Sequence, residues 1–235
     1  MESYIKNAKG NYKTPLVSIV IPCRSKKDII YKYPKECELI IIVGDEPPGR
    51  LRDYGARLAK GKYLAFIDSD AYPRDDWYTK VSYYSVASKS FCGPGVLPPK
   101  SPFLEVITDL IYKCMPFAYR VSPKRARRVV EFPTFNLIIE RDFFLTIGGF
   151  DTDMITGEDS ILCKKINDFP FPRLFYFPDV VVFHRRRLFG KPYFRQISQY
   201  GRNRGHLIRL ALLGWITTIG VYIYNFVRGF FRKKI

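Results

Sequence analysis

Short runs of aliphatic and β-branched residues recur along the first third of the chain, and each run ends in polar or charged residues. Such runs are typical of strands that are buried on both faces, as in a parallel sheet. We expect three of these strands, at residues 17–21, 38–43 and 62–67. A helix is expected at 50–60, and a second one opens at Pro73 and Asp75. This alternation predicts an α/β fold, in which helices flank a mostly parallel sheet.

The second half of the chain is less regular, and its pattern changes several times. A loop rich in Pro and Gly at 93–102 precedes apolar residues at helical spacing over 103–117, which predict an amphipathic helix. Two further strands are expected at 135–140 and 179–183, and a helix is expected at 160–166. The chain contains no internal repeat.

Polar side chains follow each of the three early strands. Arg24 follows the first strand and Asp45 the second, while Asp68 and Asp70 follow the third. In α/β sheets, ligands bind where the carboxyl ends of parallel strands meet. Two aspartates one residue apart suit a hard cation such as Mg²⁺ or Mn²⁺, which can bridge diphosphate oxygens. A lone Asp-x-Asp pair is more often a solvated turn, so this interpretation depends on the strand before it and on the other strand ends.

Two further groups have both a structural and a chemical interpretation. His184 follows the predicted strand at 179–183, so it is either an ordinary surface or core histidine or part of a mixed carboxylate–histidine metal site. A polyhistidine site is excluded because the chain has only 2 histidines. Glu158 and Asp159 open a helix, where they either interact favourably with the helix dipole or supply a general base for a hydroxyl nucleophile.

The net charge of the chain restricts the kinds of partner that we expect it to bind. The chain has 235 residues, enough for one α/β domain and a short appendage, and a formal net charge of +17. Such a field attracts phosphate groups of nucleic acid, of anionic lipid headgroups or of a nucleotide substrate. No nucleic-acid recognition motif occurs, and buried parallel strands offer no stacking face. We therefore expect no nucleic-acid partner.

The cysteines and the N-terminus indicate a cytosolic setting. The five cysteines include no Cys-x-x-Cys pair, and their odd number favours reduced, mostly buried thiols over a structural zinc site. They are at positions 23, 37, 92, 114 and 163. The first 15 residues are polar and lack the apolar core of a signal peptide. The catalytic part is expected at the cytoplasmic face of a membrane.

The C-terminal segment, residues 206–235, is apolar and basic. No charged residue occurs between Leu210 and Val227, and basic residues flank this stretch on both sides. Its apolar stripe favours a helix lying in an anionic headgroup layer over one that spans the membrane. A helix docked on the protein's own core, or in a homo-oligomer, is a third possibility. The helix at 103–117 and the basic run at 123–128 are expected to form a second membrane contact.

Taken in order, these motifs resemble the family 2 glycosyltransferases, which have the GT-A fold. The resemblance extends over about residues 15–205, which we expect to form the catalytic domain. It rests on the segments VSIVIPCRS, IIIVGDE, LRDYGARLAKGKYLAFIDSDAYPRDDW, FNLIIERDFFLTIGGFD, GEDSILCKK and FPDVVVFHRRRLFGKPYFRQISQYGRNRG. It implies a Rossmann-like domain that moves a sugar from a nucleotide-sugar donor by a metal-dependent inverting displacement. The implied acceptor is a membrane- or lipid-linked glycan, such as a polyprenyl-linked one.

The resemblance also implies roles for individual residues. The nucleotide-sugar site would comprise Pro22, Arg24, Asp45, Arg52, Asp68 and Ser69. Mg²⁺ or Mn²⁺ would be held by Asp68, Asp70 and His184. Asp159 would be the general base, with Glu158 beside it. The acceptor would be bordered by Trp77, Asn136 and Gly157.

The chain departs from the family pattern in one stretch. Residues 24–62 are shorter than usual, and a helix–strand pair that normally precedes the Arg-containing turn is absent, so the nucleotide pocket is expected to be trimmed. The main alternative function is a catalytically silent scaffold of the same fold at a membrane, against which the intact acids and His184 argue. A nucleotidyltransferase would need a Gly-rich phosphate loop after the first strand, which residues 22–25 do not provide.

Overall fold

The computed structural model describes residues 1–8, 14–25, 29, 32–113, 124–154, 157–171 and 173–185. The strands are β1 (Glu2–Lys6), β2 (Val17–Cys23), β3 (Glu38–Val43), β4 (Tyr63–Ile67), β5 (Ala71–Pro73), β6 (Ser90–Cys92), β7 (Gly95–Val96), β8 (Arg127–Arg128), β9 (Asn136–Glu140), β10 (Phe175–Tyr176) and β11 (Val182–His184). The helices are α1 (Pro48–Leu58), α2 (Trp77–Tyr84), α3 (Phe103–Lys113), α4 (Arg141–Thr146) and α5 (Glu158–Asp168).

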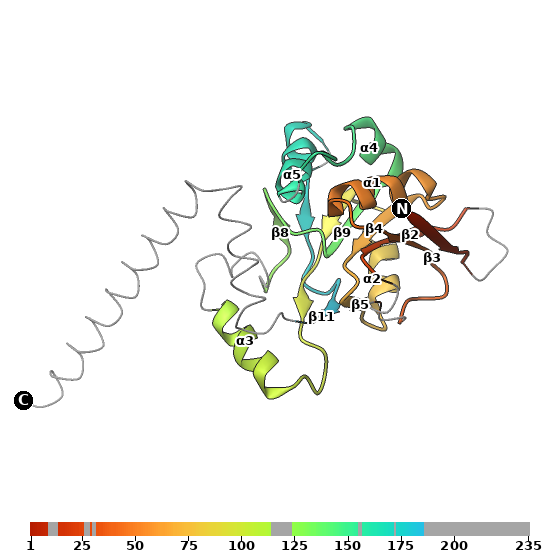
Figure 1. Ribbon diagram of the computed structural model, residues 1–235. Coiled ribbons are helices and arrows are strands. Elements are labelled where there is room, and N and C mark those ends of the chain that lie inside the picture. Colours follow the sequence, from red (N-terminus) through yellow and green to blue (C-terminus); the bar gives the residue numbers. More distant parts are fainter. Residues whose placement is uncertain are drawn as a thin grey trace, which may run out of the picture.

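The three early strands are confirmed and form the parallel centre of the main sheet. β2 lies between β3 and β4 and runs parallel to both. All side chains of β2 and β4 are buried, which is why these segments read as continuous apolar runs. Figure 1 shows β2, β3 and β4 side by side, with α1 packed near them. Because the strands are parallel, Arg24, Asp45 and Asp68 follow them at one edge of the sheet.

The main sheet is mixed: β2, β3, β4, β6 and β10 run in one direction, in line with the predicted mostly parallel sheet, and β1, β8 and β9 run the opposite way. Its eight described strands have the order β1-β3-β2-β4-β9-β6-β10-β8. β9 is antiparallel to both β4 and β6, while β1 and β8 pair antiparallel at the two edges. The sequence pattern could not reveal this, because a strand covered on both faces has the same apolar run in either direction.

The N-terminal strand β1 was not predicted at all. It pairs with β3 in a register that runs from Glu2 opposite Val43 to Lys6 opposite Leu39. Most of its side chains are exposed, so no apolar pattern marks it. The strand is held by backbone hydrogen bonds, and its polar side chains suit the outer edge of a sheet, where charge discourages further pairing.

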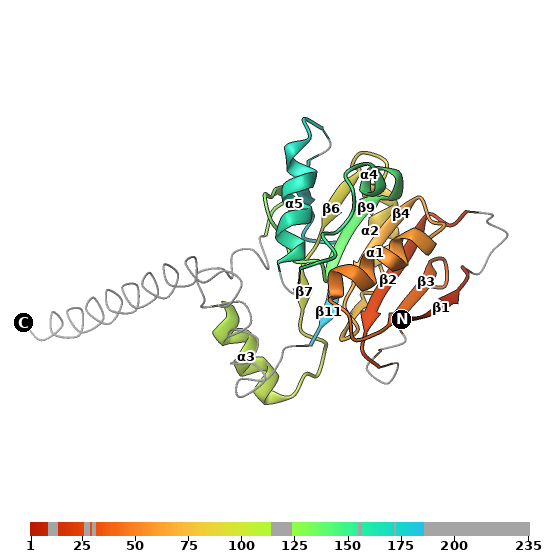
Figure 2. The ribbon, with the colours of Figure 1, turned by 45° about the horizontal axis from the view of Figure 1, so that its top comes forward.

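A second sheet of three strands, β5-β11-β7, lies beside the main one (Figure 2). β11 is antiparallel to β5 and parallel to β7. Its strand β5 replaces the beginning of the helix that we expected at Pro73 and Asp75, and α2 begins only at Trp77. This small sheet brings residues after β4 next to the end of β11.

Two of the residues predicted to border the acceptor are part of the interior instead. Trp77 and Asn136 are both 0% exposed. The indole Nε1 of Trp77 donates to Asn136 Oδ1 at 3.1 Å, and Asn136 Nδ2 donates to the carbonyl of Val180 at 2.7 Å. These bonds tie α2 and β9 to the segment before β11, so the acceptor assignment of Trp77 and Asn136 is corrected to a structural one.

Four of the five cysteines lie in the described part of the chain. Cys23, Cys37, Cys92 and Cys163 are buried, as expected, and these four form no disulfide, whereas Cys114 lies outside the described residues. Burial raises the pKa of the Cys163 thiol to about 12.

The segment 206–235, which we expect to associate with a membrane, lies outside the described residues. Among the helices that are described, none is long and apolar enough to cross a membrane.

The Trp77–Asn136 network predicts a large loss of stability in Asn136→Leu. The substitution keeps the branched shape of the side chain, with somewhat larger methyl groups, and leaves the Trp77 N–H and the Val180 carbonyl without their buried partner. We expect the free energy of unfolding in urea to fall by about 3 kcal/mol. Asn7→Leu, at an exposed position of the first segment, is the matched control and should change stability little. Wild-type stability combined with loss of sugar transfer would instead restore the acceptor role.

Candidate active site

Three potential metal ligands meet at the edge where β4 and β11 end. One ligand atom each from Asp68, Asp70 and His184 lies within 4.8 Å of the other two, and all three side chains are half-buried. His184 Nε2 is 3.2 Å from Asp70 Oδ1. The structure therefore brings together the three residues that the sequence assigned to the metal.

Strand pairing creates this cluster from residues that are far apart in sequence. After β4 the chain makes a tight turn, in which the amide of Ala71 donates to the carbonyl of Asp68 at 3.0 Å. The chain then enters β5, where Ala71 is the register partner of His184 in β11. Asp70, just before β5, is thereby placed beside His184.

The His184 imidazole is oriented by packing. Its ring lies against Phe135, with centroids 4.9 Å apart. Gly95 makes this packing possible, because a Cβ there would lie 2.8 Å from the Phe135 ring and 3.2 Å from His184 Cβ. His184 Nδ1 is buried and has no hydrogen-bond partner among the described residues, while Nε2 faces Asp70.

The cluster fits a divalent cation by its donor set. Two carboxylates and one imidazole are ligands that Mn²⁺ accepts, and Mg²⁺ also binds through one or two carboxylates. Asp68 accepts a hydrogen bond from the Arg52 guanidinium, and Asp70 lies next to the His184 imidazole. Acidic side chains are thus concentrated at this edge although the chain as a whole is strongly basic.

Arg52 of α1 joins the metal side of the site to the acids of α5. Its Nη2 donates to Asp68 Oδ1 at 2.7 Å and its Nη1 donates to Glu158 Oε1 at 2.8 Å. The side chain is only 6% exposed. Burial lowers the pKa of Arg52, but Asp68 and Glu158 outweigh this effect, so the pKa is raised overall. The described contacts of Arg52 are with these two carboxylates and with the Phe150 ring, and its predicted contact with the nucleotide stays a prediction.

Glu158 and Asp159 have different surroundings although they are adjacent. Glu158 is buried and paired with Arg52, whereas Asp159 is half-buried. Neither provides a side-chain cap for α5, whose N-cap is Gly157 with a left-handed φ of 91°. Asp159 Oδ1 accepts from the amide of Ser160 at 2.8 Å. Of the two acids, Asp159 is therefore the less buried one.

The predicted nucleotide residues occupy the same edge of the sheet with different exposure. Arg24 and Asp45 are exposed, and Ser69 is half-buried. Pro22 is buried inside β2, where it is the register partner of Ile42, so its side chain is not presented at the surface. The edge thus offers Arg24 and Asp45, rather than Pro22, to a ligand.

Sequence reasoning missed three side chains that support the site. Phe135 packs on His184, and the hydroxyl of Tyr33 donates to the carbonyl of Ala71 at 3.0 Å. The hydroxyl of Ser160, next to Asp159, donates to Glu131. The sequence carries no signal for these contacts, because each joins segments that only the tertiary fold brings together.

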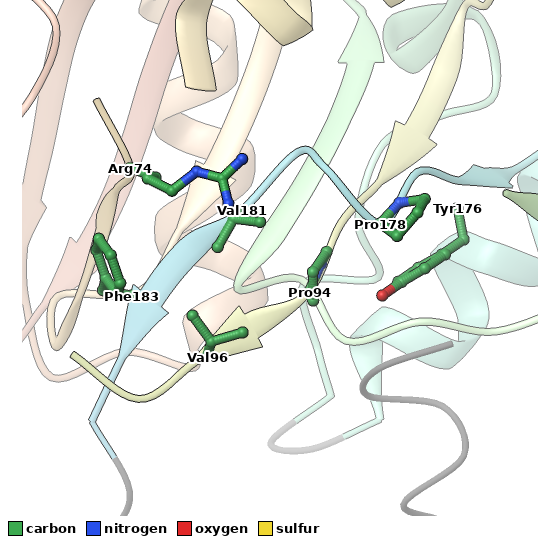
Figure 3. Close-up of a pocket in the computed structure, with 7 residues that line it drawn as sticks. All are labelled: Arg74, Pro94, Val96, Tyr176, Pro178, Val181 and Phe183. Carbon is green, nitrogen blue, oxygen red and sulfur yellow. The ribbon is translucent and has the colours of Figure 1, made fainter. Parts of the chain in front are cut away.

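A separate hollow lies on the other face of β11 (Figure 3). Its volume is about 490 Å³. Val181 and Phe183 point into it, and they alternate with His184 along the strand, so the hollow is on the opposite side from the acidic cluster. Most of its lining is apolar, which does not suit a diphosphate. The lining residues are Arg74, Pro94, Val96, Tyr176, Pro178, Val181 and Phe183.

The fold is that of known nucleotide-sugar glycosyltransferases. GalNAc-T7, solved with UDP, GalNAc and Mn²⁺, matches with a TM-score of 0.52 and 15% identity over 77% of this chain and 45% of its own. S. aureus TarS in complex with UDP-GlcNAc matches with a TM-score of 0.50 and 14% identity over 74% of this chain and 59% of its own. At such low identity, these likenesses establish the fold alone.

Sequence similarity points to the same class. The chain is 23% identical over 163 residues to the pre-mycofactocin glycosyltransferase of two Mycobacterium tuberculosis strains. The match covers 66% of this chain but only 33% of the relative, so the chain spans about a third of that protein's length. No family model matches. Fold and similarity together confirm the predicted resemblance to GT2-like glycosyltransferases of the GT-A fold.

The double ion pair of Arg52 predicts a strong effect of Arg52→Gln on stability. Removing the guanidinium leaves the buried Glu158 and the half-buried Asp68 without their shared cation. Breaking a buried pair from one side typically costs about 3 kcal/mol, measurable by urea unfolding. Arg50→Gln is the matched control on the same helix, because the Arg50–Asp153 pair is exposed, at 44% and 89%, and should contribute less than about 1 kcal/mol. Equal effects of the two substitutions would contradict this account.

Proposed function

We propose that the chain transfers a sugar from a nucleotide-sugar donor to an acceptor hydroxyl. The observation that carries the proposal is the cluster of Asp68, Asp70 and His184 at the carboxyl edge of the parallel strands. This edge is where open α/β sheets bind ligands, and the cluster is linked through Arg52 to the acids of α5. Arg52 would thus hold the residues that bind the donor and those that act on the acceptor in a fixed relative position.

The donor is proposed to be a nucleoside diphosphate sugar. The two structural neighbours support a uridine diphosphate as the first candidate, since they were solved with UDP-GlcNAc and with UDP and GalNAc. Arg24 and Asp45 are exposed at the ends of β2 and β3 and would contact the base and ribose. Ser69, between the two aspartates, would approach the diphosphate.

Asp68, Asp70 and His184 would hold a divalent cation, Mn²⁺ or Mg²⁺. The Mn²⁺ of the GalNAc-T7 structure supports this assignment, as does the mixed donor set. A bound divalent cation would supply positive charge that stabilises the departing diphosphate. Arg52, through its hydrogen bond to Asp68 Oδ1, would fix the direction of that carboxylate beside the donor.

Asp159 is proposed as the general base of an inverting displacement. Its half-buried carboxylate would accept the proton of the acceptor hydroxyl while that oxygen attacks the anomeric carbon and the nucleoside diphosphate leaves. Glu158 would act only through Arg52, as a positioning residue. Gly157, which has no side chain, would leave space for the acceptor in front of α5.

The acceptor and the location of the enzyme are further proposals. We place the chain at the cytoplasmic face of a membrane, with residues 1–205 as the catalytic domain and 206–235 as a membrane-associated helix that could also serve in a homo-oligomer. The acceptor would then be a membrane- or lipid-linked glycan, such as a polyprenyl-linked one. The net charge of +17 supports an anionic membrane surface as partner.

Nucleotide binding is predicted to depend on both metal and Asp70. The melting temperature of the protein would be measured with UDP, GDP, dTDP and CDP, each with Mn²⁺, Mg²⁺ or EDTA. A nucleotide at a hundredfold excess over its Kd stabilises the folded state by about 2.7 kcal/mol, which corresponds to a shift of about 5–10 °C. The shift should appear with one nucleotide and metal and be lost in Asp70→Ala.

Asp75→Ala is the matched control for Asp70→Ala, because the Asp75 side chain is 89% exposed five residues further along the chain. Its nucleotide-dependent shift should equal that of the unmodified protein. If no nucleotide raises the melting temperature under any metal condition, the donor proposal is wrong, and the silent scaffold of the same fold becomes the better account.

Asp159→Asn is predicted to abolish transfer while leaving donor binding intact. The amide keeps the size of the side chain but cannot accept the proton, so we expect transfer of labelled sugar to membrane glycolipids to fall by about 10²–10⁴-fold. The metal-dependent melting shift should remain. Asp168→Asn, at the exposed end of α5, should transfer normally. Near-normal transfer by Asp159→Asn would show that Asp159 is not the general base.

A further inference from the structure

The helix α3 presents its apolar side outward and its polar side inward. Glu105, Thr108 and Asp109 are buried, at 8%, 2% and 5% exposure. The apolar side chains of the same helix are exposed, at 77% for Phe103, 62% for Leu104, 40% for Val106, 40% for Ile107 and 60% for Leu110. An ordinary surface helix shows the reverse arrangement, with the apolar stripe towards the core.

The two sets of side chains occupy separate sectors of the helix. With about 100° between successive residues, the five apolar residues fall within an arc of about 160°, and the three buried polar residues fall on the opposite side. Figures 1 and 2 both show α3 at the periphery, apart from the helices α1, α2 and α4 that pack around the main sheet. The outward arc is a continuous apolar surface rather than a set of scattered exposed residues.

The charges around this surface match an anionic lipid membrane. Both carboxylates of the described part of α3, Glu105 and Asp109, are buried, so the outward arc carries no negative charge. Lys100, three residues before the helix, is exposed. The basic run at 124–128 is exposed too. An apolar helical face accompanied by Lys and Arg is the pattern of helices that lie in an anionic headgroup layer.

We propose that α3 docks on an anionic lipid surface, with Phe103, Leu104 and Leu110 entering the boundary between headgroups and acyl chains. The polar side holds the helix to the protein, since Arg185 Nη1 donates to Glu105 Oε1 at 3.2 Å. Arg185 directly follows His184 of the acidic cluster. A membrane bound by α3 therefore lies close to the candidate active site. The docking itself does not depend on the proposed transfer reaction.

The proposal is tested with a fluorescent probe on α3 in the full chain. Phe103→Trp places an indole on the outward arc, and its emission is obtained by subtracting that of the unmodified protein. We expect vesicles of phosphatidylglycerol and brominated phosphatidylcholine to quench at least half of the added emission. Vesicles of brominated phosphatidylcholine alone should quench it at least fivefold less. This local readout isolates α3 from any other segment that binds lipid.

Phe171→Trp is the matched control. Phe171 is 70% exposed and follows α5, which lies at the opposite end of the molecule from α3 in both views. Its added emission should not be quenched. Leu110→Trp gives a second probe if Phe103→Trp lowers the melting temperature.

Three outcomes would overturn the proposal. One is that the protein sediments with the anionic vesicles while the introduced α3 tryptophan is not quenched. Another is that it does not sediment with them at all. The third is emission from that tryptophan that is already blue-shifted without vesicles, which would mean that the chain itself or a second copy covers this face. None of these outcomes affects the nucleotide-dependent melting shift, which is measured without lipid.

Discussion

The placement of Arg52 between Asp68 and Glu158 is the interaction on which the candidate active site depends. One buried guanidinium satisfies a carboxylate at the end of β4 and another at the start of α5, at 2.7 and 2.8 Å. Without the cation, the buried Glu158 and the half-buried Asp68 would lose the positive charge that they share. A buried ion pair adds little net stability because both charges lose their hydration, so we infer that this pair serves to fix one arrangement. Here the fixed quantity is the position of α5, and with it Asp159, relative to the metal ligands.

The direction in which His184 points depends on the register of the small sheet. Ala71 pairs with His184, and a shift by one residue would turn the imidazole to the opposite face, towards the apolar hollow. Gly95 and Phe135 then hold the ring in place. The shortened stretch at 24–62 contains β3 and α1, and β3 lies next to the edge strand of the main sheet. There β1 covers β3, so the edge is closed by an N-terminal strand.

The sequence was sufficient for features that depend on local pattern. The strand at 38–43 was placed at its observed bounds because an apolar run between polar residues marks a doubly covered strand. The acids and His184 were found because they follow such strands. Strand direction was not predictable, and neither were the partners of Arg52 and Asn136, which lie up to 106 residues away. A buried arginine and a buried amide look like surface residues until the fold supplies their partners.

The orientation of α3 is another feature that the sequence pattern does not reveal, and it bears on the proposed function. Periodicity shows that a helix has an apolar stripe, but not which side of it faces the protein. The burial of Glu105, Thr108 and Asp109 reveals that the stripe faces outward, and Arg185 holds Glu105 on the inner side. Since Arg185 and His184 are consecutive, the contact that anchors α3 and the contact that orients Asp70 are made by one short strand end. In the proposed reaction with a lipid-linked acceptor, this connection would restrict the acceptor's orientation before it reaches Asp159, which lowers the entropic cost of aligning the two reactants.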